Sequence, residues 1–242
     1  MKVIRPNCRA QFTADDFEFI GTVIPALKAA DDGVIRLVRD PGIMDKILDE
    51  AGLFRAILEM RGCLRVSLRF YFYVLVRHVL LKEDIRDRDV ADYVAEVLAQ
   101  FSLLQRMANP DPDDERRLDY MHEMLEALER MEDDDRFAMQ IHIGNYALVF
   151  SGIFPGRLQR RVERRAAPGF RFYEELGAAH FRMAGNHHLA RRMDMVAVLL
   201  TLGQAFHVTR IALNRLSERF VFLETDRAVR DLFRDLEHPG TP

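Results

Sequence analysis

Three features of the sequence predict an all-α protein, a bundle-like single domain of about eight to ten helices. Apolar residues recur mostly every three or four positions, which is the helical period. Helix-breaking pairs that contain proline or glycine separate these stretches. The 242 residues are 49% apolar and include only two cysteines, so the chain can bury a full core without disulfide bonds. We expect one domain over residues 1–242, with the acidic segment near 108–114 as the only candidate for a subdomain boundary.

The first predicted helices are marked by their capping residues. Thr13 is a suitable N-cap, and Asp16 three positions later makes a shortened capping box. Pro25 predicts a kink in this first helix. Asp40 and Pro41 predict the N-cap and the first residue of the next helix, because the fixed φ of proline suits that position.

The segment 64–76 fits two secondary structures. Its apolar residues alternate with mostly polar neighbours, which is typical of a strand, but they also fill one face of a helix. A strand here would be well above the usual five or six residues and would have no evident pairing partner. We therefore predict a helix.

Two later segments differ in how much of their surface is apolar. Residues 87–107 are amphipathic, with one face directed inward. Residues 137–154 are apolar nearly all round, which predicts a central, buried helix. Gly144 and Gly152 within it indicate the close approach of another helix.

Residues 118–128 and 206–223 carry apolar side chains at alternating spacings of three and four, as in a heptad seam. Such seams have two interpretations. They are either ordinary packing faces within the fold or surfaces that pair with another chain.

The near-neutral net charge of −3 conceals two oppositely charged stretches. Residues 109–135 hold twelve acids and three bases, a formal charge of −9, whereas residues 155–192 hold nine arginines and three glutamates, a formal charge of +6. Three interpretations remain open: a solvated surface neutralised within the fold, an anion or nucleic-acid surface, or an interface in which acidic and basic faces of two copies meet. The whole-chain pI of about 6.3 disfavours nucleic acid. The predicted basic surface lies on one helix and consists of Arg157, Arg160, Arg161, Arg164 and Arg165.

Polar side chains within the apolar segment 137–154 are candidates for a ligand site. His142, Asn145 and Tyr146 lie at positions i, i+3 and i+4, on one stripe of the helix. Buried polar groups need partners, so this stripe is either a pocket for a small molecule or a network that fixes the helix register. The other candidate ligand residues are Arg69, Arg77, Tyr173, Glu174 and His180.

Metal binding and familiar catalysis are not indicated. Asp119 and His122 have the only spacing comparable to a di-iron helix pair, and they lie beside an acidic surface. His187 and His188 are adjacent, so we expect their side chains to diverge and the pair to mark a helix junction. No phosphate-binding loop, dinucleotide fingerprint, zinc-protease motif or serine elbow occurs.

The sequence therefore predicts a non-catalytic cytoplasmic helical protein that acts through protein–protein interaction or self-association. We expect no cofactor and no metal. The N-terminus lacks the apolar run of a signal peptide, and the longest apolar stretches, 64–81 and 195–203, are respectively charged and too short to span a bilayer, so we also expect no membrane segment. The alternative is a small-molecule sensor or enzyme with a polar pocket inside the helical bundle.

Overall fold

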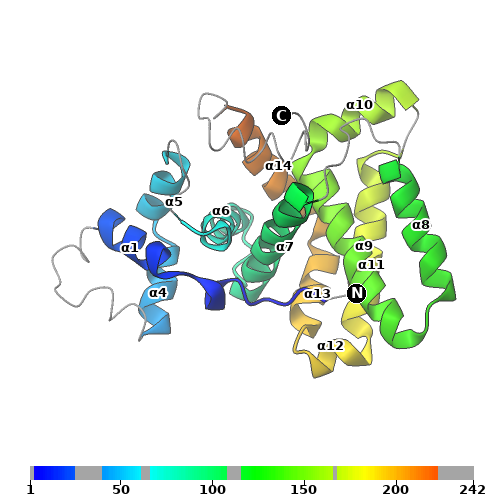
Figure 1. Ribbon diagram of the computed structural model, residues 1–242, viewed down its shortest axis with the longest axis horizontal. Helices are drawn as coiled ribbons and strands as arrows, with labels where there is room; N and C mark the ends of the chain where they lie inside the picture. The colour runs from blue at the N-terminus through cyan, green and yellow to red at the C-terminus, as the bar shows by residue number, and fades with distance from the viewer. Residues whose placement is uncertain (1–2, 25–39, 61–65, 108–115, 166–167, 223–242) are drawn as a thin grey trace.

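The computed structural model confirms the all-α prediction (Figure 1). It describes residues 3–24, 40–60, 66–107, 116–165 and 168–222, and no β-strand occurs among them. The described part contains more helices than the expected eight to ten, because short helices such as α12 follow breaks in longer ones. The elements are η1 Arg9–Gln11, α1 Ala14–Val23, α4 Pro41–Leu48, α5 Ala51–Leu58, α6 Leu68–Lys82, α7 Arg88–Met107, α8 Arg116–Arg130, α9 Asp133–Ile153, α10 Pro155–Arg165, α11 Phe170–Asn186, α12 His188–Arg192, α13 Val196–Gln204 and α14 Phe206–Phe222.

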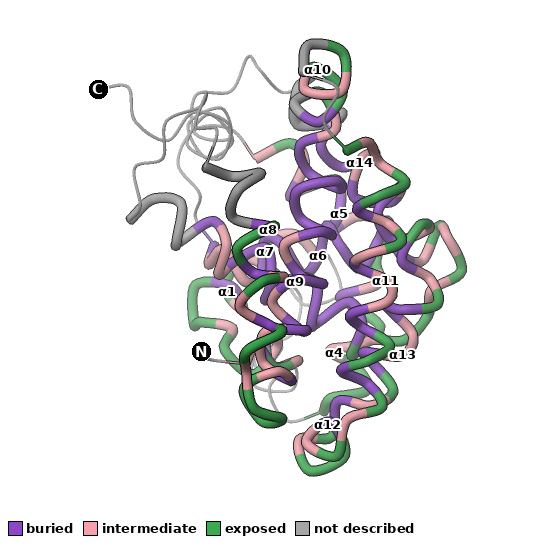
Figure 2. The backbone as a smooth tube through the Cα atoms, turned by 90° about the vertical axis from the view of Figure 1, so that its right-hand side faces the viewer, coloured by how far each residue is buried: buried purple, intermediate pink, exposed green. Residues whose placement is uncertain are grey.

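The helices are arranged around α9. It packs against α8, α10, α11 and α14, and α11 also packs against α13. Helices α6 and α7 pair in the middle of the molecule, with α1, α4 and α5 on one side and α8 to α12 on the other (Figure 1). The tube in Figure 2 is buried along much of α9, whereas exposed residues gather on α10, α12 and the outer side of α11.

Local capping explains where the early helices begin. The Asp40 carboxylate accepts hydrogen bonds from the backbone N–H groups of Gly42 and Ile43, at 2.9 and 3.2 Å, and Pro41 is the first helical residue, as predicted. The buried Asp16 carboxylate accepts from the Thr13 N–H at 2.7 Å. The predicted kink at residue 25 and the boundary near 108–114 lie outside the described residues.

Asp16 also joins α1 to the start of α6. Its carboxylate accepts from the backbone N–H and the hydroxyl of Ser67, at 2.6 and 2.7 Å. The Ser67 hydroxyl oxygen in turn accepts from the Phe70 N–H and caps α6. Within segment 64–76, residues 68–76 are therefore helical, as predicted. Its alternation misleads because Phe70 to Leu80 are buried on every face of the helix.

The two glycines of α9 lie where other helices approach closely, as predicted. A Cβ atom on Gly144 would stand 2.8 Å from the Phe181 ring of α11. One on Gly152 would stand 3.0 Å from Leu213 of α14. A side chain at either position would force Phe181 or Leu213 to move, because such distances are shorter than van der Waals contact.

Both heptad-like seams face the interior of this chain. Met121 and Leu128 of α8 are buried, and so are Phe206, Leu213 and Leu216 of α14. The side chains at positions 118, 220 and 223 lie outside the described part. Of the two interpretations, the described side chains therefore match intramolecular packing.

Within the described residues, no single helix combines the length and the apolar composition that crossing a membrane requires. The segments Val196–Gln204 and Phe206–Ser217 pass that test only as a pair, which is bent by 80° at its break.

Candidate functional site

The predicted polar stripe on α9 makes contacts with α7. Asn145 is 1% exposed, and its side-chain oxygen accepts a hydrogen bond from the hydroxyl of Tyr93 at 2.9 Å. Burial raises the pKa of Tyr93, so this hydroxyl stays protonated and donates. His142 stacks on the ring of Phe101, with 6.2 Å between centroids, and burial lowers its pKa. Two members of the stripe therefore have partners on a helix that the sequence analysis did not connect to them.

The candidates on α11 point to different neighbours. Tyr173 packs against Phe150 of α9, which also stacks on Tyr146, so these two candidate tyrosines share one aromatic neighbour. Glu174 is directed toward α14, where it accepts hydrogen bonds from Arg210 and pairs with His207 at 2.8 Å.

His180 is the candidate whose polar atom is least satisfied. It is buried, its Nδ1 atom has no hydrogen-bond partner in the described part of the chain, and burial lowers its pKa. A neutral ring is therefore favoured at this position.

Arg69 and Arg77 belong to a separate network of ion pairs on the far side of α7. Arg69 makes two hydrogen bonds to Glu96, at 2.7 and 3.0 Å. Arg77 is almost fully buried and makes two hydrogen bonds to Asp49, at 2.8 and 3.2 Å, and one to the carbonyl of Arg86. The eight candidate ligand residues thus do not converge on one site, because two belong to this network and five of the other six contact different neighbours on α7, α9 and α14.

This network joins η1, α4, α6 and α7. Burial alone would raise the pKa of Asp49, but hydrogen bonds from Arg77 and Arg88 hold it below its ordinary value. Asp92 accepts from the backbone N–H groups of Cys8 and Arg9, at 2.8 and 2.7 Å. Burial nevertheless raises the pKa of Asp92. The sequence pattern that could have indicated this network is the pair Asp92 and Glu96, which lie one helical turn apart on an otherwise apolar face.

The Cys8 thiol is part of the same buried region. It is fully buried, and burial, together with the nearby Asp92 and Glu96 carboxylates, raises its pKa. This thiol stays protonated and behaves as a small apolar group. Cys63 lies outside the described residues.

The acidic stretch forms an exposed surface at the start of α9. We call this surface the acidic end. Its exposed carboxylates are Glu129, Glu132, Asp133, Asp134 and Asp135, whereas the exposed Glu123 and Glu126 lie further back on α8, which packs alongside α9. The one ion pair described within α8 joins His122 to Glu126 at 3.1 Å.

The basic helix α10 follows the opposite terminus of α9, and we call it the basic end. Arg160 is exposed, whereas Arg161 is half-buried and lies over the Phe150 ring at 5.7 Å. The side chains of Arg157, Arg164 and Arg165 lie outside the described part, although their positions on the helix are set by the backbone.

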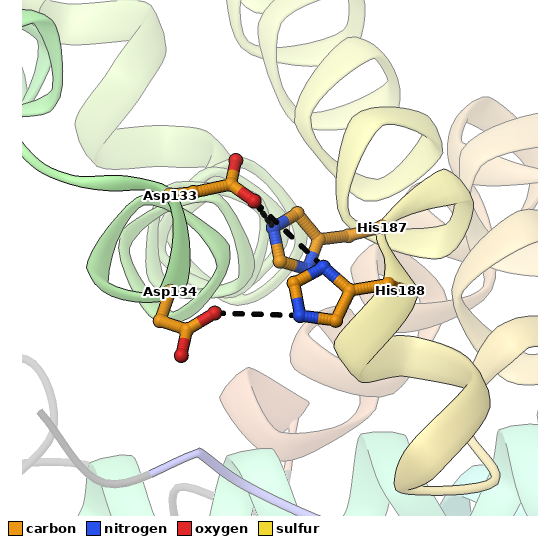
Figure 3. A group of neighbouring side chains, drawn as sticks. All are labelled: Asp133, Asp134, His187 and His188. Carbon is orange, nitrogen blue, oxygen red and sulfur yellow. Dashed lines mark ion pairs between the residues drawn. The ribbon is translucent and has the colours of Figure 1, made fainter.

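A cluster that the sequence analysis missed lies at the acidic end (Figure 3). Asp133, Asp134, His187 and His188 each place one potential ligand atom within 4.8 Å of all the others. The histidine pair does mark a helix junction, because α11 ends at Asn186 and His187 caps α12. The expectation that the two side chains diverge is wrong. Their ring centroids are 4.4 Å apart, because the break between helices replaces the 100° rotation per residue of a continuous helix.

Comparison with protein-family models, with curated proteins and with solved structures gives no match for this chain.

Proposed function

We propose that this chain is a non-catalytic cytoplasmic protein that acts through protein–protein contact, and that its first partner is a second copy of itself. The observation that supports the proposal is the separation of opposite charge. The acidic end precedes α9 and the basic end follows it, so the whole length of that helix lies between them (Figure 1).

This separation is too large for the two ends to neutralise each other. A helix of 21 residues is about 30 Å long, at 1.5 Å per residue. Charges in physiological salt are screened beyond about 8 Å. Each end is therefore available to solvent or to an oppositely charged partner, which favours the third of the three interpretations of the charge pattern.

Helix α11 supplies a surface between the two ends. It begins shortly after α10, and His187, which follows its last residue, lies 3.2 Å from the Asp133 carboxylate. Phe172 and Met183 are large apolar residues on this helix, 38% and 53% exposed. They are eleven residues apart, which places both on the same helix face. This face carries apolar contact area near both charged ends.

A two-fold axis across the middle of α11 satisfies both charges at once. Two antiparallel copies of α11 would bring Phe172 of each copy near Met183 of the other. The basic end of each copy would then lie against the acidic end of its partner. The contact is self-complementary, and its strength depends on the salt concentration.

The experiment measures the oligomeric state by sedimentation velocity at low and high NaCl. The wild-type chain is expected to dimerise at low salt and to dissociate as salt rises. A basic-end reversal, Arg160→Glu with Arg164→Glu, and an acidic-end reversal, Glu129→Lys with Glu132→Lys, should each be monomeric.

An equimolar mixture of the two charge variants is the most discriminating test of the interface. Each variant loses charge attraction at both contacts of its own homodimer. The mixed dimer pairs the substituted ends, Glu against Lys, at one contact and two wild-type ends at the other, so the mixture should form a heterodimer. Arg55→Glu with Arg86→Glu reverses two exposed arginines outside the proposed interface and should dimerise like wild type. A wild-type monomer at low salt, or a dimer that both reversals leave intact, would refute the proposal.

The second candidate function is a small-molecule site near α11, and the unpaired Nδ1 atom of His180 favours it. A ligand with a hydrogen-bond donor would satisfy this atom. Native mass spectrometry of the purified chain tests this idea, since a bound small molecule adds mass that His180→Leu should remove. A wild-type mass equal to that of the chain alone argues against it.

A further inference from the structure

The Asp133, Asp134, His187 and His188 cluster brings together two segments that are more than fifty residues apart in sequence (Figure 3). The two aspartates begin α9, and the two histidines lie at the break between α11 and α12. Figure 3 shows both carboxylates directed toward the imidazole rings. The cluster differs from an ordinary acidic helix start, because half of its potential ligands are imidazoles.

The spacing within the cluster suits a small tetrahedral ion. The His187 Nε2 and Asp133 Oδ2 atoms are 3.2 Å apart, and His188 Nε2 and Asp134 Oδ1 are 3.5 Å apart. The other His188 nitrogen, Nδ1, lies 3.7 Å from the same Asp133 oxygen, so the ring can offer either nitrogen, but only one, to an ion. Two ligands of a tetrahedral zinc ion, each about 2.0–2.1 Å from the metal, are separated by about 3.3 Å.

His187 is held in place and lacks a hydrogen-bond partner for Nε2. Its ring stacks on the buried Phe137, with 5.1 Å between ring centroids. It also contacts the ring of His188, with 4.4 Å between centroids. The Nε2 atom is buried and makes no hydrogen bond to any residue that the structure describes, and its nearest charged neighbour is the Asp133 carboxylate at 3.2 Å. This distance matches the separation of two ligands of one tetrahedral ion.

We propose that Asp133, Asp134, His187 and His188 form a binding site for a zinc-class divalent transition-metal ion. The imidazoles select such an ion over Ca²⁺ or Mg²⁺, which prefer oxygen ligands. Two carboxylates and two neutral imidazoles also balance the charge of a divalent cation. The site would tie the start of α9 to the α11–α12 junction.

The N-cap of α12 supplies the means to separate metal binding from structure. His187 Nδ1 accepts a hydrogen bond from the Leu189 N–H at 3.2 Å. Metal at Nε2 would place the ring proton on Nδ1, so metal binding would break this capping bond. Asparagine is a good N-cap residue and lacks the imidazole. His187→Asn should therefore keep the cap and lose the metal ligand.

The experiment titrates ZnCl₂ into the untagged, chelator-treated full chain by isothermal titration calorimetry. One Zn²⁺ per chain is expected, and His188→Ala, Asp134→Asn and His187→Asn should each weaken binding by more than about tenfold. Co²⁺ serves as a second probe, because tetrahedral coordination gives it intense visible absorption.

Matched controls come from the same surface. Asp135→Asn removes a carboxylate of the same helical turn, and His122→Ala removes an exposed histidine that already pairs with a carboxylate on α8. Both control variants should bind Zn²⁺ like wild type. Without metal, their melting temperatures measured by circular dichroism should match that of the wild-type chain. The absence of Zn²⁺ binding, or binding that the three ligand variants leave unchanged, would overturn the proposal.

Discussion

At the scale of single residues, His187 performs a structural role in the metal-free chain, because it caps α12. His187→Ala should lower the free energy of unfolding by about 1 kcal/mol, since the Leu189 N–H then loses its acceptor. His187→Asn should be more stable than His187→Ala by about 1 kcal/mol, because both variants lose the stacking on Phe137 but only Asn keeps a capping acceptor. Urea denaturation in the presence of a chelator measures both variants, and an equal loss in the two would contradict the capping role.

The bond between Tyr93 and Asn145 is the clearest buried side-chain hydrogen bond of the predicted polar stripe. Tyr93→Phe should cost about 1–3 kcal/mol of stability, because the Asn145 oxygen would remain buried without a donor. A double-mutant cycle with Asn145→Ala isolates the interaction. Additive losses in the two single variants would show that the bond contributes nothing of its own.

At the scale of secondary-structure elements, the Arg77–Asp49 pair joins α6 to the end of α4. Asp49→Asn should destabilise the chain by about 3 kcal/mol, because the buried Arg77 guanidinium would lose its counter-charge. Asp84→Asn removes the partner of Arg86 in an exposed pair and should cost less than about 1 kcal/mol. Urea denaturation at neutral pH measures the free energy of unfolding of both variants. Equal losses would show that the buried pair stabilises the fold no more than the exposed pair.

Elements could be predicted from the sequence wherever their cause is local. Asp40 and Pro41 start α4 through contacts within three residues, so the pattern alone identified them. The helix at 68–82 needed a further argument about strand length, because burial on all sides erases its helical period.

The arrangement of side chains between elements could not be predicted in the same way. Asn145 meets Tyr93 across 52 residues, and Arg77 meets Asp49 across 28. A stripe on one helix says nothing about which helix faces it. The same limit concealed the metal cluster, because the contact between His187 and Asp133 exists only after α9 and α11 have packed.

At the scale of the whole molecule, three histidines with lowered pKa values, two buried and one half-buried, predict a loss of stability in mild acid. Burial lowers the pKa values of His78, His142 and His180 in the folded state. The unfolded chain therefore takes up protons first, near the ordinary pKa of about 6.5. Their contribution is complete above that pH and is lost as the pH falls through the folded values.

Urea denaturation between about pH 7.5 and pH 5.5 measures this slope, which spans the ordinary histidine pKa. His180→Leu should flatten it, since the variant removes one of the three groups that resist protonation. His122→Leu changes an exposed histidine on α8 and should leave the slope as in wild type. A stability that does not change across this range would exclude the effect. Asp49, whose pKa lies below its ordinary value, contributes its full stability above about pH 4 and loses it only below that pH, so it does not affect this slope.

The contact between His187 and Asp133 also has a topological consequence. Helices α9 and α11 are joined covalently through α10 at one end, and this contact fastens them at the other. The two ends of the segment from 133 to 187 therefore meet at this contact, beyond the packing of α9 on α11 along their length. Loss of the contact allows the helix pair to fray from the acidic end inward, so amide hydrogens near residues 133 and 187 should exchange together as one cooperative unit.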